Sequence, residues 1–170
     1  MTETIAFSTK SAYDVPPGQI ILRTGEAGGA EVCIKAERMG KEFVRHYLVP
    51  LSPIPEGGAS LVYLDPEDEV ATCEGVLRLT LGPAREVPID LGVAFVNGRG
   101  TYLKVDEHRR FHGHKALGYL DLASGDVRSR QEKAVKSIHP AWRLEAVDID
   151  GRTVPIEALR EAFAASTAAS

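Results

Sequence analysis

Cysteines, aromatic residues and long apolar runs are all scarce in this 170-residue sequence. No apolar run comes near the roughly 18 residues that a membrane-spanning helix needs, since candidates such as 92–96 are short and bounded by turn residues. Residues 1–4 also lack the basic region and following apolar stretch of a secretory signal. We therefore expect a soluble, cytoplasmic protein that has no membrane among its partners.

The two cysteines, Cys33 and Cys73, are too few to staple a disulfide-rich fold. Each stands in an alternating, strand-like segment, and no C-x-x-C spacing occurs. A free cysteine in such a setting usually behaves as a small buried hydrophobe. We expect two buried thiols rather than one disulfide or a reactive or metal-bound cysteine. The sequence leaves open whether the two lie close in space.

The overall composition is that of an ordinary globular protein. Apolar residues make up 44% and charged residues 26% of the chain, which excludes a wholly disordered, collagen-like or coiled-coil protein. A chain of this length usually forms one domain with a core of its own. We expect a single β-rich domain over residues 1–165, with the Pro/Gly-rich stretch 51–58 as a surface connection, followed by a flexible tail at 166–170.

Short runs of Val, Ile, Leu, Tyr and Phe alternate with polar residues between Gly and Pro positions along most of the chain. The strongest hairpin signal is Asn97-Gly98, because this pair supplies the positive φ angles that tight turns need. Hairpins are predicted at 93–96 with 101–105, 117–122 with 127–130, 144–149 with 152–154, and 31–36 with 43–49. This pattern is typical of a mainly β fold, either a β-sandwich or a partly open β-barrel.

Helix signals are confined to two places. Pro155 suits a first helical position, and Ile156, Leu159 and Phe163 recur at helical spacing, which predicts a C-terminal amphipathic helix over about 155–165. Its simplest role is to cover an open face or edge of the sheet, with binding of a partner as the alternative. A capping-box pattern that begins at Ser129 also predicts a short helix near 130–138.

Positive charge gathers in one part of the chain. Residues 99–143 hold 10 Lys or Arg against 5 Asp or Glu, whereas residues 1–98 hold 8 against 14 and residues 144–170 hold 2 against 5. A locally basic surface attracts anions even when the net charge is negative, here −4. Backbone N–H groups of the turn at 98–100 could add to such a site. The residues predicted to bind an anion are Arg99, Lys104, Arg109, Arg110 and Lys115.

The sequence therefore predicts a non-catalytic binding module for an anionic small ligand or an acidic protein surface. Nucleic acid is the less favoured partner, because only 6% of residues are aromatic and the isoelectric point is near 5.7. One alternative is that the basic residues form a solvated face without a ligand. Another is a structural or assembly subunit that pairs through a sheet edge or the C-terminal helix.

An enzyme hypothesis rests on the histidines. His112 and His114 stand two residues apart, so on an extended strand both imidazoles project to one side, about 6.6 Å apart along the chain, and could reach one divalent metal. Asp106 or Glu107 could serve as a further ligand or as the general base of a metal-dependent hydrolysis. The neighbouring Arg109 and Arg110 oppose a cation there through charge repulsion, so this hypothesis stands second.

Overall fold

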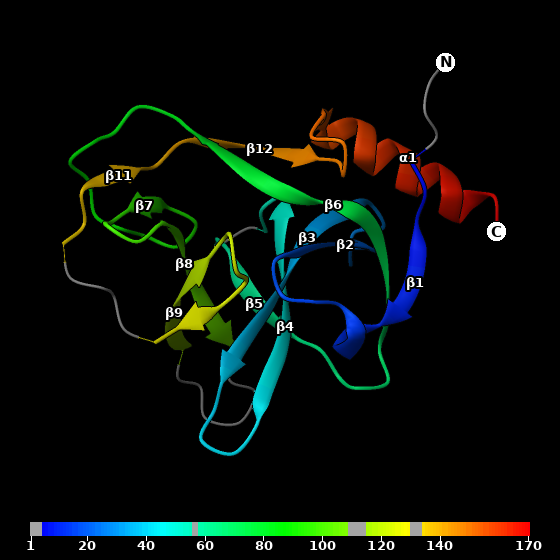
Figure 1. Cartoon of the computed structure of the whole chain (residues 1–170), viewed down its shortest axis with the longest axis horizontal. Helices are drawn as coiled ribbons and strands as arrows, with labels where there is room; N and C mark the ends of the chain where they lie inside the picture. Colours follow the sequence, from blue (N-terminus) through cyan, green and yellow to red (C-terminus); the bar gives the residue numbers. More distant parts are fainter. Residues whose placement is uncertain (1–4, 56–57, 109–114, 130–133) are drawn as a thin grey trace.

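The computed structural model describes residues 5–55, 58–108, 115–129 and 134–170, with only the backbone described for 107, 108 and 115–117. Its architecture is mainly β, as predicted: one 13-stranded sheet with a single α-helix at the C-terminal end of the chain (Figure 1). A short 3₁₀ turn at Ala12–Asp14 precedes β2. No helix in these ranges is both long and apolar enough to cross a bilayer.

The strands follow one another mainly as antiparallel hairpins. Along the sheet they lie in the order β10-β9-β8-β5-β4-β3-β2-β6-β12-β13, with β1 on β6 and with β7 between β8 and β11. Among the described strands, only β5 and β8 form a parallel ladder. The bounds are β1 Ser8–Ser11, β2 Gln19–Thr24, β3 Ala30–Met39, β4 Val44–Ser52, β5 Ser60–Tyr63, β6 Glu69–Leu81, β7 Ala94–Val96, β8 Thr101–His108, β9 Lys115–Asp121, β10 Val127–Arg128, β11 Ser137–His139, β12 Trp142–Val147 and β13 Thr153–Pro155.

The sheet curves back on itself without closing among the described residues. Its β10 end returns to β3 through a single parallel bridge between Glu37 and Asp126. The Glu37 backbone N–H donates to the carbonyl of Gly125 at 2.9 Å, and the Gly18 N–H donates to the carbonyl of Lys35 at 2.8 Å. The turn between β9 and β10 is thus held against β3 at Glu37.

All four predicted hairpins are present. The Asn97-Gly98 turn joins β7 and β8, and the others are β9–β10, β12–β13 and β3–β4. Local turn chemistry was sufficient to predict them, because each turn lies directly between the two strands that it pairs. The stretch at 51–58 separates β4 from β5, which are neighbours in the sheet.

Both faces of the central strands β2 and β3 are buried. Ile20 and Leu22 contribute to a large core together with residues of β4, β8 and the helix, whereas Ile21 faces a smaller core beneath the segment 12–15. The side-chain alternation of a strand produces this division. Cys33 lies in the smaller core and Cys73 in the larger one, so the prediction of two buried free thiols is confirmed.

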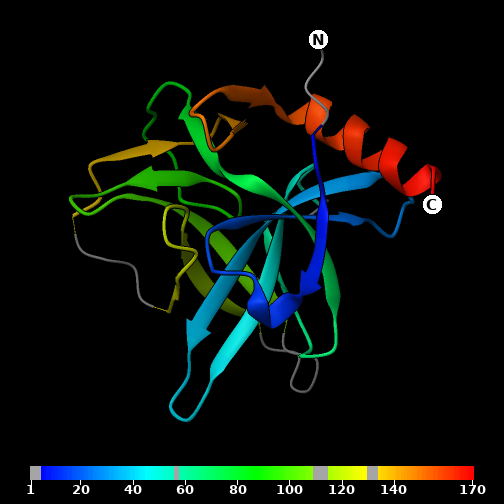
Figure 2. The ribbon, with the colours of Figure 1, turned by 45° about the vertical axis from the view of Figure 1, so that its right-hand side comes forward.

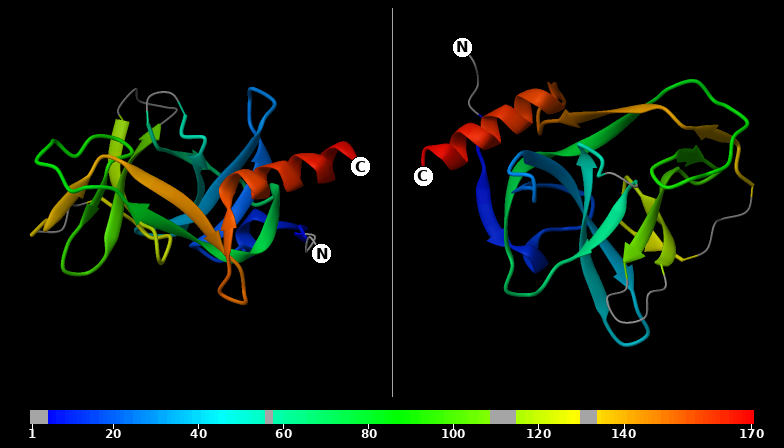
Figure 3. Two further views of the ribbon diagram at one scale, coloured as in Figure 1. Left: turned by 90° about the horizontal axis from the view of Figure 1, so that it is seen from above. Right: turned by 180° about the vertical axis from the view of Figure 1, so that it is seen from behind.

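The C-terminal helix α1, Ile156–Ala168, lies across one end of the sheet beside β12 and β13, as the turned views show (Figures 2 and 3). Its predicted apolar stripe, Ile156, Leu159 and Phe163, is buried. The helix runs three residues beyond the predicted end at 165, so the assignment of 166–168 to a tail was wrong. Alanine has the highest helix propensity, and the Thr167 hydroxyl donates to the preceding turn at 3.0 Å.

The short helix predicted near 130–138 is not found in the described part of that range. Residues 137–139 form β11, which pairs with β7, and the Lys136 N–H donates to the carbonyl of Val96 at 2.7 Å. Ala134 has a φ of +72°, which is incompatible with a right-handed helix. Pairing with a strand 40 residues earlier thus outweighed the local capping signal; residues 130–133 lie outside the described ranges.

Candidate binding cleft

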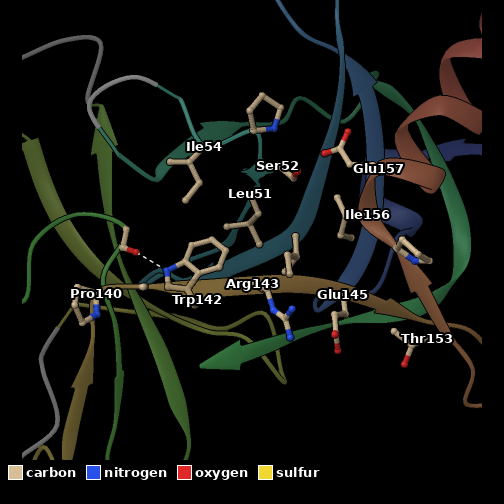
Figure 4. A pocket seen from close by; sticks show the side chains of 15 residues that line it. Leu51, Ser52, Ile54, Pro140, Trp142, Arg143, Glu145, Thr153, Ile156 and Glu157 are labelled. Atoms are coloured by element: carbon tan, nitrogen blue, oxygen red, sulfur yellow. Dashed lines mark hydrogen bonds between the residues drawn. The ribbon is translucent and has the colours of Figure 1, made fainter. Parts of the chain in front are cut away.

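An open cleft of about 700 Å³ separates the end of β4 from β12, β13 and the first turn of α1 (Figure 4). Leu51 and Ile54 form one wall, and Trp142 and Leu144 of β12 form the other. Ile156, at the start of α1, closes one end. Leu51 and Ile156 are buried, whereas Ile54 is 38% exposed at the lip. The cleft therefore has a covered apolar floor and an accessible apolar rim.

The alternation of β12 decides which side chains enter the cleft. Trp142 points toward Leu51 and Ile54, whereas Arg143 and Glu145 project to the other side of the strand (Figure 4). Because β12 pairs with β6 along 142–147 but with β13 only along 145–147, its first residues leave room on the side of the cleft. Strand register thus gives the cleft an apolar wall with charged residues at its lip.

The indole of Trp142 is fixed in place. Its Nε1–H donates to the carbonyl of Gly92 at 2.8 Å, and the Gly92 N–H donates to the carbonyl of Lys104 at 2.8 Å. Gly92 has a φ of +80°, a backbone conformation that favours glycine. The largest side chain of the cleft is therefore anchored to β8 through the loop before β7, so this wall is formed before any ligand arrives.

The carboxylates that line the cleft are already paired. Glu145 accepts a hydrogen bond from Arg78 at 3.0 Å, and this bond holds the pKa of the Glu145 carboxyl below its usual value. Glu157 accepts from Arg160 at 2.9 Å. Arg143, by contrast, is exposed and has no hydrogen bond or ion pair with any part of the chain that the structure describes. Its charge acts on the neighbouring Glu145 and helps to lower the pKa of that carboxyl, although no hydrogen bond joins the two side chains.

The predicted anion-binding residues that the structure describes are spread along the β8–β9 hairpin. Arg99 is exposed in the turn before β8, whereas Lys115 starts β9 opposite His108, at the other end of the same hairpin. The strand β8 between these ends is about 23 Å long at roughly 3.3 Å per residue. Lys104 lies between them, and its ammonium donates to the carbonyl of Ile89 at 2.7 Å. Arg109 and Arg110 lie outside the described residues.

Two backbone N–H groups of the 98–100 turn already have a partner within the turn. The N–H groups of Arg99 and Gly100 both donate to the side-chain oxygen of Asn97, at 2.8 and 3.2 Å. Asparagine commonly satisfies its own turn in this way. Arg99 and Gly100 therefore do not offer free backbone N–H groups to an anion, and the same asparagine correctly predicted the hairpin.

The metal hypothesis falls mainly on residues that the structure does not describe, since His112 and His114 belong to 109–114. Asp106 is buried in β8. His139 uses both ring nitrogens, one with the hydroxyl of Ser137 at 2.8 Å and one with the carbonyl of Gly82 at 2.7 Å. Within the described ranges, no three His, Cys, Asp or Glu side chains come together as metal ligands. The hydrolytic hypothesis remains a prediction about the 109–114 segment.

The thiols and one buried charged cluster complete the chemistry of the described residues. Burial raises the pKa of Cys33 to about 12 and that of Cys73 to about 11. Lys35 is fully enclosed, and its ammonium lies 3.9 Å from the carboxylate of Glu37. The same carboxylate lies 3.3 Å from Nδ1 of His46, whose pKa is lowered by burial and by the nearby lysine. This cluster joins β3 to β4 beneath the 3₁₀ turn.

Sequence reasoning missed the cleft, although it singled out part of the basic segment to which Arg143 belongs. The one local signal was the single tryptophan of the chain beside an arginine. Comparison with protein-family models, curated proteins and solved structures finds no match to this chain.

Proposed function

We propose that the protein is a non-catalytic binding module whose cleft takes a ligand with an apolar body and an anionic group. The observation that carries the proposal is the preformed apolar cleft formed by Leu51, Ile54 and Trp142, with the exposed Arg143 on the other side of β12. An arginine matches carboxylate and phosphate oxygens with two parallel hydrogen bonds. The cleft would bind the apolar body of the ligand, and an anionic group that extends over the edge of β12 would meet Arg143.

The size and lining of the cleft support this proposal. Its volume of about 700 Å³ falls within the usual range of small-molecule sites. Such sites are mainly apolar with a few polar groups that fix orientation, and the cleft follows this pattern. Arg143 is the last residue of the basic segment 99–143, so the anionic ligand expected from the sequence is retained while its site moves from the 99–115 hairpin to β12.

The assembly alternative has less support at the helix. The three large apolar residues of the α1 stripe, Ile156, Leu159 and Phe163, are buried against the sheet. A partner would therefore meet a helix face made mainly of alanine, serine and charged residues. Docking helices usually present an apolar stripe to the partner, so the cleft is the better candidate.

Binding can be followed through Trp142, because it is the only tryptophan in the chain. We expect octanoate to change its emission in a saturable way and to bind less tightly at high salt, whereas 1-octanol binds without salt dependence. Arg143→Gln should weaken octanoate about tenfold, the loss expected for one charge-assisted contact, and leave 1-octanol unchanged. Arg85→Gln, which removes an exposed arginine that does not line the cleft, is the matched control.

A second variant tests the apolar contribution of the cleft separately from the contribution of the Arg143 charge. Ile54→Ser should weaken octanoate and 1-octanol alike, because it removes apolar surface from the rim without changing a charge. The proposal fails if neither probe gives saturable binding. The role of Arg143 fails if its variant and the Arg85 control bind octanoate equally well.

A further inference from the structure

Strand β11 brings a serine and a histidine together. Its end residues, Ser137 and His139, stand two apart, so their side chains project to the same face of the strand. The hydroxyl oxygen of Ser137 lies 2.8 Å from Nε2 of His139, and Nδ1 of the same ring lies 2.7 Å from the carbonyl oxygen of Gly82. Both residues are partly exposed, and neither lines the cleft.

The two hydrogen bonds of the His139 ring decide where its proton lies. A carbonyl oxygen only accepts, so Nδ1 carries the ring proton and donates to Gly82. In the neutral imidazole Nε2 is then an acceptor, and the Ser137 hydroxyl donates to it. The hydroxyls of Ser11 and Ser166, by contrast, donate to backbone carbonyls, which do not take up a proton. The hydroxyl of Ser137 therefore faces a group that can remove its proton.

The Gly82 carbonyl that orients the ring is itself held against β11. The Gly82 N–H donates to the carbonyl of Ala141 at 2.8 Å, and the Arg85 N–H donates to the carbonyl of Ile138 at 2.9 Å. A Cβ at position 82 would lie 2.7 Å from the Ala141 carbonyl oxygen, so this close approach requires glycine. The other edge of β11 pairs with β7 along all three residues (Figure 1). Backbone contacts on both edges of the strand therefore hold the imidazole and the hydroxyl in place.

From this geometry we propose that Ser137 is an acylation site for activated esters, with His139 as the general base. A nucleophile within hydrogen-bond reach of a base that a third group orients is the diagnostic arrangement of an activated serine. Here the carbonyl of Gly82 has the orienting role. The inference goes beyond the binding proposal, because it concerns a covalent modification of the chain outside the cleft.

The reaction transfers the acyl group from the ester to the serine. As Oγ of Ser137 forms a bond to the acyl carbon, its proton passes to Nε2 of His139. The bond between the acyl carbon and the ester oxygen then breaks, and His139 returns the proton to the departing oxygen. The products are an ester on Ser137 and a free alcohol or phenol, so the step needs no further reactant.

Incubation of the full chain with p-nitrophenyl acetate, followed by peptide mass spectrometry, tests the inference. Trypsin cleaves after Lys136 and Arg143 and releases the peptide 137–143, in which Ser137 is the only hydroxyl and no lysine occurs. We expect this peptide to carry one acetyl group that hydroxylamine removes, as it does from an ester. The rate of acetylation should rise from about pH 5 and level off by about pH 8, once the imidazole is neutral. Unassisted attack by a hydroxyl would instead keep rising about tenfold per pH unit.

Two variants test the role of the base. His139→Gln should slow acetylation of Ser137 about a hundredfold, the loss expected for a general base, whereas Ser11→Ala should leave its rate unchanged. Thermal unfolding shows whether each variant is folded, and the pH profile of the wild type decides if His139→Gln is not. An unmodified peptide 137–143, a rate that never levels off, or equal rates in a folded His139→Gln variant and the wild type would overturn the inference.

Discussion

Lys35 is the residue at which the stability of this fold can be tested most directly. Its side chain is fully buried, and its ammonium donates to the carbonyl of Ala12 at 2.6 Å and to that of Val15 at 3.0 Å. The two carbonyls belong to the segment that covers the smaller core, and both residues are themselves buried. Replacing Lys35 by methionine keeps most of the side-chain length and removes the donor.

The expected loss of stability follows from these two carbonyls. A buried acceptor left without a donor costs about 1–3 kcal/mol, so two of them cost about 2–6 kcal/mol. Part of this cost is offset because the variant no longer buries a charged group. In the wild type, burial disfavours the charged ammonium and lowers the pKa of Lys35. We expect Lys35→Met to reduce the free energy of unfolding by about 2–4 kcal/mol.

Urea unfolding followed by Trp142 emission measures this loss. Lys10→Met, at an exposed position on β1, is the control and should change the free energy of unfolding by less than about 0.5 kcal/mol. Buried charges are often no more stabilising than apolar residues of the same size. A Lys35→Met protein as stable as the wild type, or more stable, would therefore refute the reasoning that the ammonium is needed by the two carbonyls.

Three further predictions concern pH, thiol reactivity and backbone packing. Because the pKa of His46 is lowered in the folded state from 6.5, the unfolded chain takes up its proton first, so wild-type stability should decline as the pH falls below about 6.5 toward the folded value. His46→Gln should show a smaller decline in urea titrations at several pH values, and equal declines would contradict the assignment. Cys33 and Cys73, with pKa values raised to about 12 and 11, should react with a disulfide reagent at pH near 8 only after denaturation; rapid labelling of the native protein would show that a thiol is accessible. Gly125→Ala should lower the thermal midpoint by several degrees, because φ is +75° and the added Cβ would lie 2.7 Å from the Lys35 carbonyl, and an unchanged midpoint would show that the β9–β10 turn is not held tightly against β3.

Hairpins and the C-terminal helix were predictable because their signals are local. Asn97-Gly98 sets its own turn, and the spacing of Ile156, Leu159 and Phe163 defines one face of a helix. The segment 134–139 was not predictable in this way. Its conformation depends on pairing with β7, whose residues lie about 40 positions earlier, and no capping pattern contains that information.

The candidate site was less predictable than the fold. The basic residues from Arg99 to Lys115 look contiguous in the sequence, yet a hairpin places its two ends about 20 Å apart when the strands have seven or eight residues. Trp142 and Arg143 are adjacent in the chain and face opposite sides of β12. The residues that Trp142 faces in the cleft come from the end of β4 and the loop after it, about 90 positions earlier in the chain.

The sequence by itself determined the mainly β architecture, the positions of the principal turns, the apolar stripe of α1 and the burial of both thiols. These features follow from backbone preferences and side-chain alternation over a few residues. Only the tertiary structure decided that Leu51 faces Trp142 and that the Lys35 ammonium donates hydrogen bonds to two carbonyls of the 12–15 segment. It also decided that Met39 projects into solvent while other apolar residues of β3 are buried. Each depends on which strands are neighbours and where their pairing ends, a property of long-range register rather than of local composition.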